Sequence, residues 1–223
     1  MRTAPEDLRP FADRREAGRE LAGRLHAYAG RGDVIVLALP RGGVPVGYEV
    51  ARALGAGLDV FLVRKLGVPG HRELAMGALA SGGVRVLDEA LIDHLGIPPD
   101  AVDAITREEQ AELERRESAY RHGAGLDVRG RLAILVDDGL ATGSTMKAAV
   151  RAVRQLEPSR IIVAVPVGSR EACRDLARVA DEVVCARVPP QFAAVGQWFR
   201  DFAQTTDAEV QSLLEAVGTG PPG

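Results

Sequence analysis

The sequence predicts an α/β protein in which a mostly parallel sheet lies between two layers of helices. Short continuous apolar runs, such as residues 34–39 and 132–136, are typical of parallel strands that helices cover on both faces. Amphipathic segments alternate with these runs, and such alternation is typical of a three-layer α/β/α domain. The chain has 223 residues, of which 46% are hydrophobic, so residues 1–223 suit a single domain with an insertion.

The first half of the chain alternates helix and strand patterns. Asp13 is suited to cap the first helix, and Pro45 suits the first turn of the second. The repeated glycines and prolines after residue 66 favour a mobile loop. The expected elements are a helix over 12–28, a strand over 34–39, a turn at 40–43, a helix over 44–54, a strand over 58–63, a loop over 66–83 and a short strand over 84–87.

The second half begins with a highly charged helix expected over residues 98–121. Nine side chains of residues 107–121 are charged, so most of this helix must face water. A solvated flap, a dimer contact and a moving lid all fit this pattern. The further expected elements are a strand over 132–136, a helix after residue 145, a strand over 160–165, a helix over 169–179 capped by Ser169 and a strand over 183–188.

Composition argues against several classes of function. The net charge is −3, with 28 basic and 31 acidic residues, so no overall basic field points to nucleic acid. No apolar run approaches the length of a membrane span. The first ten residues lack the apolar core of a signal peptide, and the two cysteines lack metal-site spacing. We therefore expect a cytoplasmic protein that binds small molecules.

Residues 132–145 carry the most chemical information. Asp137 and Asp138 stand at the end of a buried strand, and a short loop leads into a helix. Backbone N–H groups at a helix N-terminus favour an anion, and Gly143 lets the backbone approach that anion closely. The carboxylates would repel a phosphate, so sugar hydroxyls and a divalent metal suit them better. A ribose 5-phosphate fits this combination, whereas the plain alternative is a strand-to-helix turn with an Asp cap.

This segment resembles the signature with which type I phosphoribosyltransferases bind 5-phosphoribosyl 1-pyrophosphate (PRPP). It departs from the signature at Gly139, where an aliphatic residue or Ser is usual. The resemblance implies the type I phosphoribosyltransferase fold, and it implies that Asp137 and Asp138 hold the ribose hydroxyls and Mg²⁺. It also assigns the 5-phosphate to the loop residues Ala141, Thr142, Gly143, Ser144 and Thr145.

A second anion-binding candidate is the turn Pro40, Arg41, Gly42 and Gly43. An arginine can donate two hydrogen bonds to phosphate oxygens, and the glycines precede a predicted helix. Alone, this pattern is equally typical of an ordinary turn. Beside the PRPP motif it resembles the family's pyrophosphate loop, which in relatives often contains a strained or cis peptide.

Two cations, Arg64 and Lys65, follow the predicted strand 58–63, at the edge where a parallel sheet binds its ligands. They are candidates for stabilising a departing pyrophosphate, although a solvated basic pair is the alternative. The stretch RKLGVPGHRELAMG resembles the flexible catalytic loop of the family, especially that of adenine phosphoribosyltransferases. Within it Glu73 is the candidate for proton transfer, and a surface carboxylate without a role fits the pattern equally well.

The tail carries most of the aromatic residues, and a C-terminal hood is expected over about 189–217, with a helical insertion over about 88–125. Phe192 and Trp198 are candidates for stacking on a flat acceptor, or they anchor the tail on the core. The whole chain resembles a group of bacterial phosphoribosyltransferases without an assigned acceptor, which share its DRxxAG start, LPRGG loop, VRK loop and FxAVGxWxxDF tail. Ala141 replaces the acid of the 6-oxopurine enzymes, which disfavours guanine and hypoxanthine.

The resemblance implies transfer of phosphoribosyl from PRPP to a nitrogenous base or related small-molecule acceptor, with Mg²⁺ and release of pyrophosphate. A non-catalytic PRPP or nucleotide sensor and a phosphoribosyl hydrolase remain alternatives. A homodimer is compatible with the resemblance, because dimers are common in the family. The residues name neither the acceptor nor the role of the charged helix over 98–121.

Overall fold

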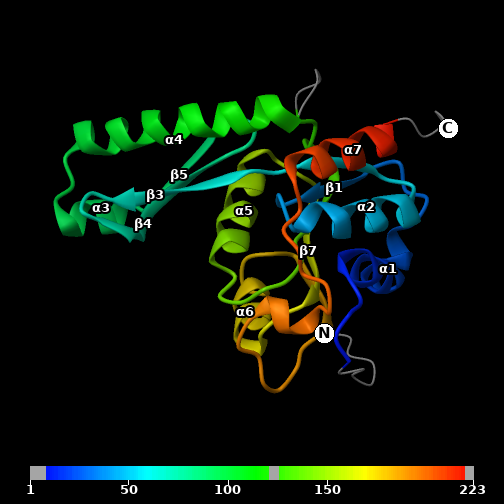
Figure 1. Cartoon of the computed structure of the whole chain (residues 1–223). Helices are drawn as coiled ribbons and strands as arrows, with labels where there is room; N and C mark the ends of the chain where they lie inside the picture. Colours follow the sequence, from blue (N-terminus) through cyan, green and yellow to red (C-terminus); the bar gives the residue numbers. More distant parts are fainter. Residues whose placement is uncertain (1–8, 121–125, 219–223) are drawn as a thin grey trace.

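The computed structural model describes residues 9–120 and 126–218, and its centre is a five-stranded parallel sheet (Figure 1). The strand order is β2-β1-β6-β7-β8, so the chain starts at the strand next to one edge, adds β2 outside it and then builds towards the other edge. This arrangement confirms the predicted fold class. The strands are β1 (Val34–Ala38), β2 (Gly57–Val60), β6 (Leu132–Val136), β7 (Arg160–Val167) and β8 (Glu182–Arg187).

Helices cover both faces of this sheet because its strands are apolar on both faces. Ile35 and Leu37 of β1 belong to one buried cluster, with α5 and α6, whereas Val34 and Val36 belong to another, with α1 and α2. Successive strand residues point to opposite faces, so a continuous apolar run builds two cores. The covering helices are α1 (Arg14–Arg24), α2 (Gly43–Leu54), α5 (Ser144–Gln155) and α6 (Arg170–Leu176).

Both predicted helix caps are confirmed. Asp13 accepts a hydrogen bond from the Glu16 amide at 2.8 Å, and Ser169 accepts one from the Ala172 amide at 3.1 Å. The first helix is shorter than predicted, because it ends at Arg24 and a separate 3-10 turn, η1 (His26–Tyr28), follows.

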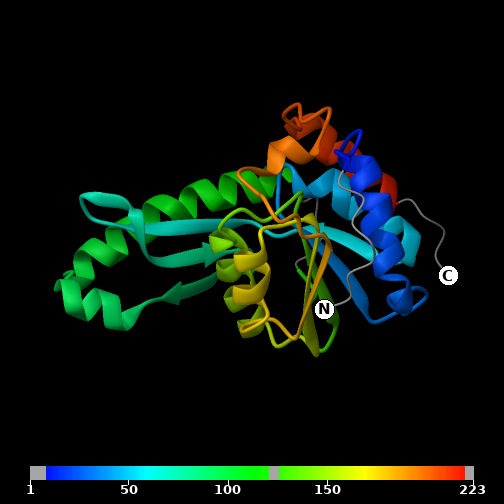
Figure 2. The ribbon, with the colours of Figure 1, turned by 90° about the horizontal axis from the view of Figure 1, so that it is seen from below.

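An elongated arm projects from the side of the domain (Figures 1 and 2). Three antiparallel strands form its sheet, and α4 packs across β3 and β4 through its buried residues Val102, Leu113 and Tyr120. The predicted charged helix is therefore confirmed, with residues 121–125 outside the described part of the chain. The arm consists of β3 (Val63–Val68), β4 (His71–Ala80), β5 (Val84–Leu87), α3 (Glu89–Leu95) and α4 (Pro99–Tyr120).

The prediction of a loop over 66–83 is wrong. Residues 69–70 form a tight turn, with Gly70 at φ +76°, between two paired strands. Met76, Leu79 and Ala80 are buried, whereas Glu73 and Leu74 are exposed, so the second strand becomes buried with distance from the turn. The glycines supply the turns and the register shifts of this hairpin rather than breaking it.

The predicted strand 58–63 also ends early. β2 stops at Val60, and the chain leaves the parallel sheet to begin β3 at Val63. Lys65 therefore lies inside an antiparallel strand of the arm, where it pairs with Ala78, and not at the end of a parallel strand.

The tail returns across the domain to the N-terminal segment and then to α2. Phe199 pairs with Phe11, and both rings belong to a small buried cluster beside Val167. The tail contains η2 (Val195–Trp198) and α7 (Asp207–Gly218), which packs on α2 and β2. Across residues 9–120 and 126–218, none of the helices combines the length and the apolar character that a membrane span requires.

Candidate active site

Two of the predicted ligand loops meet at the carboxyl end of the parallel sheet. A methyl group placed on Gly42 would lie 2.1 Å from Oδ2 of Asp138, and one placed on Gly43 would lie 2.8 Å from the carbonyl oxygen of Val136. A side chain at either position would collide with the acidic segment. The two glycines therefore let the loop after β1 pack directly against Asp137 and Asp138 after β6.

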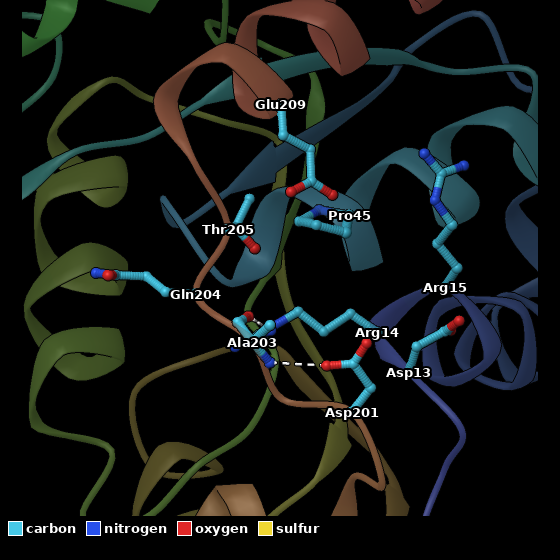
Figure 3. A pocket seen from close by; sticks show the side chains of 9 residues that line it. All are labelled: Asp13, Arg14, Arg15, Pro45, Asp201, Ala203, Gln204, Thr205 and Glu209. Carbon is cyan, nitrogen blue, oxygen red and sulfur yellow. Dashed lines mark hydrogen bonds between the residues drawn. The ribbon is translucent and has the colours of Figure 1, made fainter.

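Arg14 was not identified from the sequence, although it lies in the DRxxAG start. Its Nε donates to Oδ2 of Asp138 at 2.9 Å, and its Nη1 donates to the Ala203 carbonyl at 2.7 Å. Its guanidinium carbon also stands 4.0 Å from the centre of the Phe202 ring. One side chain thus joins the N-terminal helix, an acid of the PRPP motif and the tail. Figure 3 shows Arg14 reaching from α1 towards Ala203 while the neighbouring Arg15 points elsewhere.

Arg14 and the tail also border a cavity of about 220 Å³ (Figure 3). Its lining is mostly polar and includes carboxylates from α1, the tail and α7, with the Pro45 ring as an apolar wall. The lining includes Asp13, Arg14, Pro45, Asp201 and Glu209.

The two acids lie next to each other in a largely desolvated place. Burial raises the pKa of Asp137 well above its usual range, and the adjacent charge of Asp138 raises it further. Burial also raises the pKa of Asp138, while its hydrogen bond to Arg14 opposes that shift. Such a pair favours ligands that bring hydroxyl donors or a cation to it.

The loop after the acids leaves the N-terminus of α5 open. Ala141, Thr142, Ser144 and Thr145 are exposed, and Gly143 takes the capping position without a side-chain hydrogen bond to the helix. The unpaired N–H groups of a helix N-terminus favour an anion. Gly143 has a φ of +69°, which favours glycine, and a methyl group there would make only ordinary contacts with the protein, from 3.4 Å. Its close approach to an anion stays a prediction.

The loop after β1 contains a cis peptide bond between Pro40 and Arg41. Arg41 turns towards the C-terminal helix, where its Nη1 lies 3.7 Å from Oδ1 of Asp207. The Tyr120 hydroxyl of α4 donates to the same oxygen at 2.5 Å. Arg41 is thus held beside the base of the arm, between α4 and α7.

The predicted cations of the arm point to different places. Arg64 pairs with Glu109 of α4 at 2.6 Å and does not line the groove between the arm and α5. Lys65 and Glu73 line this open groove of about 950 Å³, and Thr142 of the phosphate loop lines it as well. The structure therefore brings Lys65 and Glu73 towards the loop that the sequence assigned to the 5-phosphate, and it does not bring Arg64 there.

Three comparisons place these features among known proteins. The family model described as "Phosphoribosyl transferase domain" matches residues 70–196, which is more than half of the chain. The chain belongs to the phosphoribosyl transferase domain family. This membership agrees with the family resemblance of the PRPP motif.

Individual relatives resemble nearly the whole phosphoribosyl transferase chain. The protein TT1426 of Thermus thermophilus is 43% identical, with a TM-score of 0.80, and the match covers 92% of this chain and 97% of that one. "Putative phosphoribosyl transferase Rv0571c" of Mycobacterium tuberculosis H37Rv is 46% identical over 209 residues, as is its counterpart MT0597 in strain CDC 1551. The match covers 93% of this chain but 47% of these two relatives, so the chain spans about half of their length.

The tail of this phosphoribosyl transferase domain lies directly on the loop between β6 and α5, at Gly139. A methyl group on Gly139 would stand 2.6 Å from Cγ1 of Val195 and 3.2 Å from Cγ1 of Val167. The usual aliphatic residue would therefore displace η2. Glycine at this position lets the tail descend onto the loop between β6 and α5.

The predicted acceptor residues lie in this tail. Phe192 and Trp198 are half-buried and pack against the cluster around Phe11 and Phe199. Within the described residues, Nε1 of Trp198 is buried and lacks a hydrogen-bond partner. Both rings therefore anchor the hood in this structure, and their contact with an acceptor stays a prediction.

Proposed function

We propose that the chain transfers the phosphoribosyl group of PRPP to a nitrogenous acceptor and releases pyrophosphate. The observation that carries this proposal is the meeting of three ligand-binding features at one sheet edge. They are the paired acids after β6, the open N-terminus of α5 and the glycine loop after β1. Each matches one chemical part of PRPP: the diol, the 5-phosphate and the pyrophosphate.

Each part of the site has a task that follows from its charge. The α5 amides and the hydroxyls of Thr142 and Ser144 bind the 5-phosphate. Asp137 and Asp138 accept hydrogen bonds from the ribose hydroxyls and orient the sugar ring. The backbone at Gly42 and Gly43 binds the pyrophosphate, since their missing side chains leave that backbone accessible.

Lys65 is the proposed partner of the leaving group, with Glu73 as the nearby proton-transfer candidate. Both lie on the arm and face the groove that reaches Thr142. Negative charge grows on pyrophosphate as the bond to the sugar breaks, so a cation here favours the transition state more than the bound substrate. Closure of the arm over the sheet edge would exclude water, which competes with the acceptor.

The acidic pair is suited to hold Mg²⁺. Among residues 9–120 and 126–218, groups of three or more His, Cys, Asp or Glu side chains arranged for a metal are absent. Mg²⁺ commonly takes one or two carboxylates and completes its shell with water and substrate oxygens, so Asp137 and Asp138 suffice. When bound with PRPP, the ion would neutralise charge on the pyrophosphate.

The test replaces the acids and follows binding and turnover separately. Asp137→Asn with Asp138→Asn should abolish Mg²⁺-dependent PRPP binding in calorimetry and leave the circular dichroism spectrum unchanged. Asp127→Asn, an exposed acid that pairs with Arg131, is the matched control. Unchanged PRPP affinity in the double variant would contradict the assignment of the ribose site.

The reaction class is decided by pyrophosphate release from the unmodified chain with PRPP, Mg²⁺ and a panel of nitrogenous bases. Release that requires a base supports the transferase. Release without any base would indicate a hydrolase, and tight binding without release would indicate a sensor.

A further inference from the structure

Two buried thiols lie side by side behind the candidate active site. Cys173 of α6 is 4% exposed and Cys185 of β8 is 8% exposed. A methyl group on Gly168 would stand 3.0 Å from the Cys173 sulfur and 3.1 Å from the Cys185 sulfur, so both sulfurs border one point of the backbone. The Cys185 thiol donates a hydrogen bond to the Arg187 carbonyl at 3.3 Å, and the chain has two cysteines in all.

The two thiols differ in acidity because of this contact. The neighbouring Cys185 thiol lowers the pKa of Cys173. The same contact, together with burial, raises the pKa of Cys185 well above its usual range. The thiolate is the reactive form of cysteine, so Cys173 should react with an oxidant before Cys185 does. Cys185 is then placed to attack the oxidised Cys173 sulfur.

The backbone beside the thiols is joined to the candidate phosphate loop. Leu140 donates its N–H to the Val167 carbonyl, and Ser169 donates its N–H to the Leu140 carbonyl, both at 2.9 Å. Ser169 also donates from Oγ to the Ala141 carbonyl at 2.8 Å. Ser169 caps α6, which contains Cys173. A shift of α6 would therefore move the Ser169 side chain and disturb its hydrogen bond to Ala141.

We propose that Cys173 and Cys185 form an intramolecular disulfide when a hydroperoxide oxidises the protein, and that this bond loosens the loop at residues 141–143. The Cys173 thiolate attacks one peroxide oxygen, the O–O bond breaks, and a sulfenic acid forms as hydroxide or alkoxide leaves. The Cys185 thiol loses its proton and its sulfur attacks the Cys173 sulfur, so the S–O bond breaks and water leaves. The hydroperoxide receives the two electrons that the thiols lose.

The loosening follows from the geometry around Gly168. A disulfide holds its sulfurs about 2.0 Å apart, which is closer than two unbonded sulfur atoms can approach. Both sulfurs lie close to the backbone at Gly168, so we expect the shortening to shift α6 or residues 167–169. The Ser169–Ala141 hydrogen bond joins these parts to the loop and should weaken. An effect on ribose 5-phosphate binding rests on the proposed function, whereas the disulfide and the loop movement do not.

The experiment treats the whole chain with hydrogen peroxide and measures free thiols, intact mass and amide hydrogen exchange. We expect both free thiols to be lost and amide exchange at residues 141–143 to become faster. The mass of the chain should fall by two hydrogen atoms, apart from any oxygen that methionine gains. Exchange in β2 should stay unchanged, and dithiothreitol should reverse every change. Cys173→Ser and Cys185→Ser should each prevent the disulfide and the change in exchange, with Cys173→Ala replacing the first variant if it folds poorly.

Three results would overturn the proposal: retention of both thiols, sulfinic acid without a disulfide, or a disulfide with unchanged exchange at 141–143. Ribose 5-phosphate affinity of the oxidised chain should fall at least threefold and recover on reduction. If the reduced chain does not bind ribose 5-phosphate at all, the proposed function fails, and hydrogen exchange alone then decides the redox proposal.

Discussion

Nε of Arg14 donates a hydrogen bond to Oδ2 of Asp138 at 2.9 Å, between residues 124 positions apart in the sequence. Both side chains are largely buried, at 12% and 15% exposure. The same guanidinium binds the tail at Ala203 and faces the Phe202 ring. Because the acid belongs to the candidate ribose site, this contact couples the position of the hood to the charge at that site.

Removal of Arg14 should therefore destabilise the fold through the charge that it leaves behind. We expect Arg14→Gln to lower the free energy of unfolding by about 2–3 kcal/mol, somewhat less than for a fully buried pair, because some exposure remains. Urea denaturation measures the difference. Arg19→Gln, on the same helix and 55% exposed, should cost under about 0.5 kcal/mol. Equal losses in the two variants would show that the Asp138 contact contributes nothing specific.

Gly143 should be essential for phosphate binding because of its backbone conformation. Its φ of +69° is unfavourable for a β-branched residue, so Gly143→Val should distort the loop and weaken ribose 5-phosphate binding by about 2 kcal/mol. Gly130 provides a matched control, since it has φ +70° and open space around it. Gly130→Val should lose stability but keep ribose 5-phosphate affinity in calorimetry. Comparable affinity losses would indicate a general effect of strain.

Gly139 and Val195 should behave as a coupled pair. Gly139→Ala places a methyl group 2.6 Å from Cγ1 of Val195, and we expect this overpacking to cost about 1–3 kcal/mol of stability. Val195→Ala removes the obstructing methyl groups, so the double variant should be more stable than the sum of the two single losses predicts. Thermal or urea unfolding of all four proteins measures the coupling. Additive losses would mean that the hood does not rest on the loop at this point.

Much of this architecture could be predicted from the sequence, because local residue patterns determine where the strands lie and where the helices begin. Apolar runs predicted all five parallel strands, although β2 ends earlier than expected, and Asp13 and Ser169 predicted two helix caps. The glycine-rich segment after residue 66 was misread, since glycines at hairpin turns and register shifts look like those of a loop. Arg14 was missed because its partner, Asp138, is distant in sequence. Which residues a long side chain contacts depends on the packing of whole elements, and no local pattern records it.

Tyr120 should ionise at unusually high pH. Burial and the hydrogen bond to Asp207 raise its pKa to about 12. The unfolded phenol loses its proton near pH 10, so this stabilisation is present below about pH 10 and is lost as the pH rises towards about 12. The tyrosinate absorbance of the wild type minus that of Tyr120→Phe reports the midpoint. Asp207→Asn should lower it, and a wild-type midpoint near 10 would contradict the structure.

Lys65 should matter more for turnover than for binding. It lies on the arm and faces the groove that reaches Thr142, so arm closure would bring its charge to the departing pyrophosphate. Since negative charge grows on the leaving oxygen, Lys65→Ala should lower kcat by about a hundredfold, the scale of losing one oxyanion donor. PRPP affinity should fall much less, because the phosphate and diol contacts remain. Arg85→Ala removes another arm cation, one that pairs with Asp103, and should change neither quantity by more than about twofold. Steady-state kinetics and calorimetry together separate the cases. Equal losses in kcat and affinity would mean that Lys65 only helps to bind PRPP. No loss in either would mean that the backbone of the loop after β1 stabilises the leaving pyrophosphate without Lys65.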